Sequence, residues 1–214
     1  MFKTALMLAL GFFSCNTLAE NYDAFVGTMR VNFQPLSHGG VAYGCSLLFN
    51  SINLDYAYKQ GKPVQGVGNF SYMVTSPTQF GMSLKLGVSD VLDGKNKVEA
   101  PFFAYIKTPN GTTGGMKNIS NDSDTKGFRM FVPVVNESSM AVLFDLVDGK
   151  NAEIGFNRKK DGMDAMLPLD LTVEDTVADS EGLLKRQHSR LAIDGFNKCV
   201  LELSSKLDFN KSKK

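Results

Sequence analysis

The fold is decided by residues 40–74, which read GVAYGCSLLFNSINLDYAYKQGKPVQGVGNFSYMV. In the first part of this stretch apolar side chains alternate with small or polar ones, so that an extended chain has one apolar face and one polar face. The apolar face consists of Val41, Tyr43, Cys45, Leu47 and Phe49. This pattern predicts a β-strand that is buried on one side.

A second alternation follows, made by Ile52, Leu54, Tyr56 and Tyr58. Its phase differs by one residue from that of the first, which predicts a tight turn or a β-bulge at Asn50 and Ser51. Residues 60–63 combine a glycine, which supplies a positive φ, with a proline, which fixes φ. They predict a turn before a further strand over residues 64–74, so the whole stretch is expected to form an antiparallel meander.

Strand patterns continue along the rest of the chain. Alternation of period two, interrupted by turns rich in Gly, Pro and Asn, is typical of an all-β domain. It covers residues 23–33, 80–88, 100–107, 152–158 and 163–171. The last of these segments places Met163 and Leu167 on its inward face, and Pro168 assigns it to a sheet edge because proline has no N–H to donate.

Two helices are expected among these strands. A short one is predicted near residues 138–148, capped by Ser138 and Ser139, and a C-terminal one near residues 195–207, begun by Asp194. The apolar residues of the first helix recur at helical spacing and are Met140, Leu143, Phe144 and Val147. The sequence therefore predicts a mainly β fold, an antiparallel β-sandwich-like domain with these two helices.

The first 19 residues have the features of a secretory signal peptide. Lys3 supplies the positive charge, residues 5–13 form a short apolar core, and Ala19 ends a small-residue cleavage site. An alternative is a lipoprotein signal with Cys15 acylated. We expect a secreted or periplasmic protein whose residues 20–214 form a single β-rich domain, with no transmembrane segment after signal cleavage.

The net charge and the cysteine content indicate which partners are disfavoured and in which compartment the protein is found. Without Lys3 the chain has 22 basic and 22 acidic residues, which does not favour nucleic acid as a partner. Cys45 and Cys199 remain after cleavage, and in an oxidising compartment two such cysteines are expected to pair as a disulfide. Neither has a histidine or a second cysteine at the spacing of a metal site.

The chain lacks the residue patterns of common enzymes. Its two histidines, His38 and His188, do not form a spaced metal-ligand pair, and there is no Gly-X-Ser-X-Gly elbow or phosphate-binding glycine loop. We therefore predict no catalytic residue, no metal and no cofactor. One catalytic alternative stays open, a hydrolase of envelope polymers that uses two carboxylates brought together by the fold. The candidates are Asp55, Asp90, Asp93, Glu99 and Asp145.

Residues 111–127 are mostly Gly, Thr, Ser, Asn and Asp, and form a longer connection than compact domains usually contain. Such a loop is either disordered or functional. Its candidate binding residues are Asn118, Asn121, Asp122 and Asp124.

The pattern Asp-X-X-Asp-Gly-Lys-Asn occurs twice, over residues 90–96 and 145–151. Two acidic loops could bind Ca²⁺, but neither copy has the spacing of an EF-hand. The preferred interpretation is a turn in which glycine supplies the positive φ.

These patterns favour a non-enzymatic secreted or periplasmic binding protein, for example an inhibitor or immunity-type protein, whose partner is another envelope or secreted protein. A structural or envelope-assembly role is a further alternative.

Overall fold

The computed structural model describes residues 22–92, 97–114, 119–180 and 183–208, so the predicted signal peptide lies outside the described residues. All the described strand pairs are antiparallel. In chain order the elements are η1 (Tyr22–Phe25), β1 (Gly27–His38), β2 (Val41–Asp55), β3 (Lys62–Ser76), β4 (Gln79–Asp90), β5 (Phe103–Lys107), β6 (Ile119–Asp122), β7 (Arg129–Val132), α1 (Glu137–Val147), β8 (Ala152–Asn157), β9 (Ala165–Leu169), β10 (Val173–Ala178), β11 (Leu184–His188) and α2 (Leu191–Ser204). The prediction of a mainly β protein with two helices, one of them C-terminal, is confirmed.

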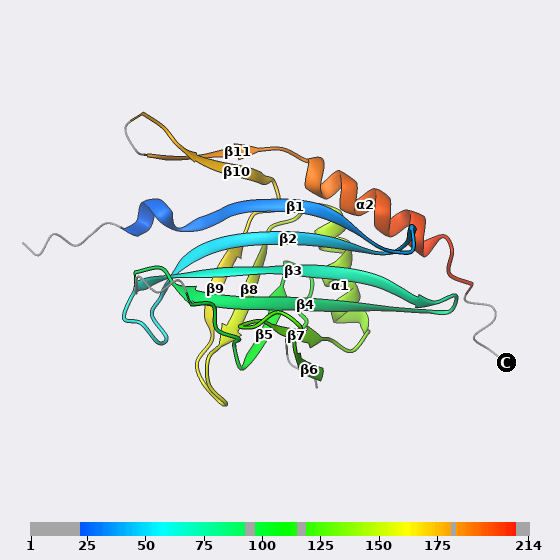
Figure 1. Ribbon diagram of the computed structural model, residues 1–214, viewed down its shortest axis with the longest axis horizontal. Coiled ribbons are helices and arrows are strands. Elements are labelled where there is room, and N and C mark those ends of the chain that lie inside the picture. Colours follow the sequence, from blue (N-terminus) through cyan, green and yellow to red (C-terminus); the bar gives the residue numbers. More distant parts are fainter. Residues whose placement is uncertain (1–21, 93–96, 115–118, 181–182, 209–214) are drawn as a thin grey trace, which may run out of the picture.

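A six-stranded sheet forms the body of the molecule, with the strand order β1-β2-β3-β4-β7-β6 (Figure 1). Its first four strands are long and joined in sequence, as the meander prediction requires. β1 continues through Pro35, which the sheet tolerates because β1 is an edge strand, and the chain turns only at Gly39 and Gly40. The sheet is not closed.

The turn predicted as one alternative at Asn50 and Ser51 is absent, because β2 is one continuous strand of 15 residues. A register shift of the β1–β2 pairing does lie opposite these two residues, but the extra residue belongs to β1, between Thr28 and Arg30. The inward face of β2 simply becomes polar at this point. Ser51 donates a hydrogen bond to the carbonyl of Pro168, and Asn53 donates one to the carbonyl of Met166 at 2.6 Å. These polar side chains therefore donate hydrogen bonds to backbone carbonyl groups of the edge strand β9, and they do not mark a turn.

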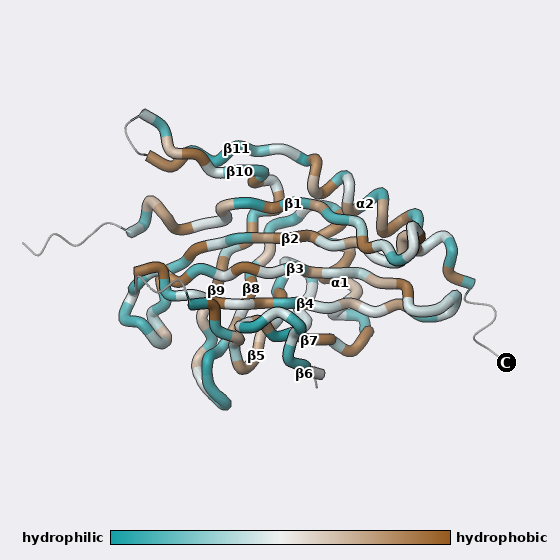
Figure 2. Tube along the Cα trace, in the orientation of Figure 1, coloured by the Kyte–Doolittle hydropathy of each residue, from teal (hydrophilic) through white to brown (hydrophobic). Residues whose placement is uncertain are grey.

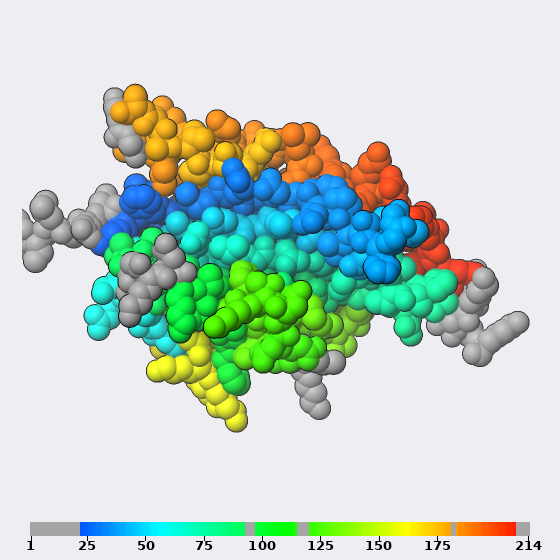
Figure 3. Space-filling view, in the orientation of Figure 1, coloured from blue at the N-terminus to red at the C-terminus, as the bar shows by residue number. Residues whose placement is uncertain are grey.

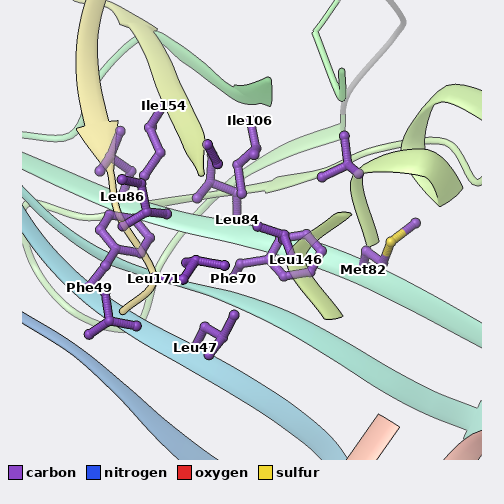
Figure 4. Packing of buried hydrophobic residues seen from close by; sticks show 14 of the residues in the cluster. Leu47, Phe49, Phe70, Met82, Leu84, Leu86, Ile106, Leu146, Ile154 and Leu171 are labelled. Carbon is purple, nitrogen blue, oxygen red and sulfur yellow. The ribbon is translucent and has the colours of Figure 1, made fainter. Parts of the chain in front are cut away.

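A second, three-stranded sheet, β5-β8-β9, covers the inward face of the body together with α1. The hydrophobic core lies between these layers, and Figure 4 shows Phe49, Phe70 and Leu84 of the large sheet facing Ile106 and Ile154 of the small one. Both layers thus share one core. Along the chain the apolar residues concentrate in these strands, whereas the tip of the β8–β9 hairpin is hydrophilic (Figure 2).

The β8–β9 hairpin confirms the predicted pairing, with β9 at a sheet edge and Leu167 buried. Met163 was predicted to face inward, and this is wrong: it lies before β9 in the exposed turn with 70% of its surface accessible.

The N-cap of helix α1 lies two residues before Ser138, the first of the two predicted caps. Asn136 is the N-cap, its side chain accepts from the backbone N–H of Ser139 at 3.0 Å, and Ser139 Oγ accepts from the N–H of Asn136 at 2.9 Å. The predicted apolar face is partly wrong, because Phe144 is exposed and Asp145 is buried in its place. The reason is the set of hydrogen bonds to Asp145 described below.

Helix α2 packs against β1 and β2 at one edge of the body and is tied to the sheet by the disulfide Cys45–Cys199. It begins three residues before Asp194, which lies in its first turn and not at the cap. The β10–β11 hairpin lies along the other part of β1, so hairpin and helix together line this edge (Figure 3). Among the described helices none has the length and apolar character needed to cross a membrane.

Candidate functional site

A cleft of about 610 Å³ opens on the outer face of the three-stranded sheet. The floor of the cleft is formed by the outward-pointing residues of β5. Ala104 and Ile106 point into the core, so the residues next to them along the strand point outward. The floor is formed by Phe103, Tyr105 and Lys107. One wall is the loop 108–114 with Ser138 at the start of α1, and Asp164 in the β8–β9 turn lies at the other side.

Tyr105 and Asp164 form the polar centre of this cleft. The hydroxyl of Tyr105 donates to Asp164 Oδ2 at 2.8 Å, and Asn157 Nδ2 donates to Asp164 Oδ1 at 3.3 Å. Burial of the phenol, together with its hydrogen bond to Asp164 and the charge of that carboxylate, raises the pKa of Tyr105 to about 12. The phenol is therefore a hydrogen-bond donor at physiological pH, and it fixes the orientation of the carboxylate.

The ring of Tyr105 fits against two glycines. A Cβ atom at Gly155, in β8, would come within 2.3 Å of the ring, and one at Gly114 would come within 2.7 Å. Any other residue at either position would displace the ring. The ring centroid of Phe103 lies 5.9 Å from that of Tyr105, so the floor presents two neighbouring aromatic side chains.

Asp145 fixes the loop wall of the cleft from behind. Its carboxylate is almost fully buried and accepts from the backbone N–H of Asn110 at 2.9 Å, from Asn110 Nδ2 at 2.8 Å and from Lys150 Nζ at 2.7 Å. Burial alone would raise the pKa of Asp145, but the hydrogen bonds from Lys150, Asn110 and Thr108 outweigh it and hold the pKa well below its usual range. The loop is thus anchored to α1 by a carboxylate that is charged at neutral pH.

The cleft continues along the surface. A hollow of about 270 Å³ shares Lys107 and Thr108 with it, and a third of about 350 Å³ shares Asn151, Ala152 and Glu153 with the second. Through these shared residues the three hollows follow one another from β5 toward β1, and we call this row of hollows the groove. A groove of this length suits an extended ligand better than a compact one.

Part of the predicted binding loop forms a strand, whereas its other described residues, 111–114 and 123–127, lie outside the strands. Asn121 and Asp122 belong to β6, which pairs with β7, and Asp124 lies in the turn between them. Asp122 pairs with Arg129 at 3.1 Å, and Asp124 pairs with Lys85 at 3.0 Å. Asn118 lies outside the described residues. Asn121, Asp122 and Asp124 do not line the cleft.

Among the candidate carboxylates, Asp55 and Asp90 meet at one cation. Arg158 Nη2 lies 2.6 Å from Asp90 Oδ1, and Arg158 Nε lies 3.4 Å from Asp55 Oδ2, an ion-pair contact that lacks hydrogen-bond geometry. Lys59 Nζ adds a contact of 2.6 Å to Asp90 Oδ2. Burial would raise the pKa of Asp90, but Lys59 and Arg158 outweigh it and lower the pKa.

The other candidates are also engaged or lie elsewhere. Glu99 pairs with Lys97 at 2.9 Å on the surface, Asp145 holds the loop wall, and Asp93 lies outside the described residues. Among the candidates in the described part, the structure therefore brings no pair of carboxylates to the cleft. Within the described ranges no three His, Cys, Asp or Glu side chains lie close enough to hold a metal ion.

The two Asp-X-X-Asp-Gly-Lys-Asn segments have different structures. The first begins at the end of β4, and its residues 93–96 lie outside the described part. The second ends α1, where Gly149 adopts a φ of +76°. For this copy the turn interpretation is confirmed, and both leading aspartates are bound by cationic side chains of the protein.

Sequence reasoning missed the cleft because Tyr105 and Asp164 are 59 residues apart. A signal was present in the strand 100–107, whose outward residues are aromatic and basic. The partner strand and the turn that complete the site could not be assigned without the register of β5 on β8.

No protein-family model, curated protein or solved structure matches the chain significantly.

Proposed function

We propose that this is a non-enzymatic secreted or periplasmic binding protein, of the inhibitor or immunity type, that holds an extended segment of another envelope or secreted protein in the groove over β5. The observation that carries the proposal is the cleft itself: its floor is aromatic, its polar groups are fixed in place, and the groove continues beyond it.

The composition of the cleft favours binding over catalysis. The phenol of Tyr105 is kept protonated, and the hydroxyl of Ser138 is hydrogen-bonded to the backbone of Thr112 instead of to a base. The disulfide fits an oxidising, extracytoplasmic compartment, where another secreted protein is available as a partner.

Site-specific photocrosslinking tests this proposal. Lys107 lines both the cleft and its continuation and is 60% exposed, so the photoreactive residue p-benzoylphenylalanine can replace it without disturbing the core. The matched control carries the same residue in place of Lys198, which is 79% exposed on α2. Both variants are expressed in the source organism and irradiated in intact cells.

A single protein adduct from position 107 that is missing from position 198 is the expected result, and mass spectrometry of the adduct identifies the partner. No adduct from position 107, or the same adducts from both positions, overturns the proposal.

A further inference from the structure

The carboxylate of Asp164 has no cationic partner in the described part of the protein, although it faces a cleft. Its two contacts are the neutral donors Tyr105 and Asn157, one on each oxygen. A carboxylate has acceptor sites for about four hydrogen bonds, so each oxygen can accept one more. A planar guanidinium or an ammonium is the group that makes the strongest use of these sites.

Lys107, the basic residue that lines the cleft, is not a cationic partner of Asp164. Lys107 pairs instead with Glu153 of β8, where Nζ lies 3.9 Å from Oε2. The positive charge on the floor is therefore offset by a neighbouring carboxylate, while the negative charge of Asp164 is not offset. The cleft favours a cation over an anion.

The aromatic floor strengthens this preference. A cation within about 6 Å of an aromatic ring gains electrostatic stabilisation from the face of the ring. Phe103 and Tyr105 are adjacent, and the hydrogen bond from Tyr105 brings its ring next to Asp164. The same ligand group can therefore contact a ring and the carboxylate.

We infer that the cleft binds a basic side chain, an arginine or a lysine of the partner protein, between Asp164 and the rings of Phe103 and Tyr105. This inference rests on the proposed function and specifies the chemistry of the segment that the groove accepts.

Peptide titration tests the inference on the mature disulfide-bonded chain. The probes are N-acetyl-Gly-Arg-Gly-amide and the same peptide with citrulline, which has nearly the shape of arginine but no charge. Incorporated 3-fluorotyrosine gives a ¹⁹F NMR signal for Tyr105. The protein variants are Asp164→Asn, which keeps an oxygen for the Tyr105 hydroxyl, and Glu202→Gln on α2 as a remote control.

The arginine peptide is expected to shift the Tyr105 signal saturably, and the citrulline peptide to bind about tenfold or more weakly. Asp164→Asn should remove this difference, whereas Glu202→Gln should preserve it. Equal binding of both peptides, undiminished arginine binding to Asp164→Asn, or no binding of the arginine peptide overturns the inference.

The two experiments separate the two claims. If position 107 captures a partner while the arginine peptide does not bind, the basic side chain is wrong and the proposed function stands. If the arginine peptide binds but no partner is captured, the proposed function fails at this site.

Discussion

At the scale of single residues, the cation Arg158 stabilises the one fully buried carboxylate of the large sheet. Asp55 has no exposed side-chain surface, and Arg158 also holds Asp90. In Arg158→Met the carboxylate of Asp55 loses its cation while staying buried, and removal of one partner from a buried pair costs about 3–5 kcal/mol. We expect the free energy of unfolding in urea to fall by about 3 kcal/mol.

A surface pair provides the control for this substitution. Lys97 and Glu99 are mostly exposed, and such pairs contribute only about 0–1 kcal/mol. Lys97→Met should therefore leave the urea midpoint nearly unchanged. Similar losses in both variants would show that Arg158 does not stabilise the core.

Asp145 makes the stability of the folded protein depend on pH in the acid range. Its pKa is lowered in the folded state, so the stability that it contributes is fully present above the pKa of the unfolded chain, near 3.9, and is lost as the pH falls toward the lower folded pKa. Asp145→Asn should destabilise the protein at pH 7 by about 2 kcal/mol, the size of a hydrogen bond to a charged group. Between pH 4 and about pH 2 the difference in the free energy of unfolding between this variant and the wild type should become smaller. Urea unfolding at several pH values measures it, and a difference that stays constant with pH contradicts the assignment.

At the scale of the elements, the disulfide clamps α2 to β2. Cys45 and Cys199 close a loop of 154 residues, and the chain-entropy treatment gives roughly 4–5 kcal/mol for a loop of this length. The double variant Cys45→Ser, Cys199→Ser should melt at a lower temperature than the oxidised wild type, and reductant should affect only the wild type. Identical melting curves for the two proteins without reductant would show that the disulfide does not stabilise the fold.

The repeated acidic segments end elements and are expected to bind no calcium. In each the leading aspartate is already bound by a protein cation, Arg158 for Asp90 and Lys150 for Asp145. Millimolar Ca²⁺ should leave the melting temperature of the protein unchanged, with Mg²⁺ as the matched control. A saturable rise in Ca²⁺ alone would show a metal site.

Most of the secondary-structure elements could be predicted from the sequence, and the exceptions have a physical reason. Most strands, both helices and the disulfide follow from periodicity and from the cysteine count, because these are local or compositional signals. Two of the errors fall where a polar residue is buried by a distant partner. Ser51 and Asn53 face inward because β9 supplies carbonyl acceptors, and Asp145 replaces Phe144 on the buried face of α1 because Asn110 and Lys150 bind it. The cleft depends on such a distant pair as well, so the local pattern of residues 100–107 could indicate its floor but not Asp164.

At the scale of the whole molecule, the two main sheets cannot be separated without exposing the core that they share. Apolar residues of β2, β3 and β4 lie in one cluster with those of β5, β8 and β9. Separate unfolding of the small sheet would leave the inward face of the large sheet in water, which is strongly unfavourable at about 25 cal/mol per Å² of apolar surface. The described chain should therefore unfold in one cooperative transition.

Two tyrosines report on the two layers independently. Tyr72 is buried in the large sheet, where its hydroxyl lies 2.9 Å from Ser204 of α2, and Tyr105 belongs to the small sheet. With 3-fluorotyrosine in both positions, the two folded ¹⁹F signals should disappear at the same urea concentration in the oxidised protein. Loss of the Tyr105 signal at a lower concentration would mean that the small sheet, and with it the cleft, opens while the body stays folded. Coincident loss would mean that the small sheet and the body unfold together, as their shared core requires.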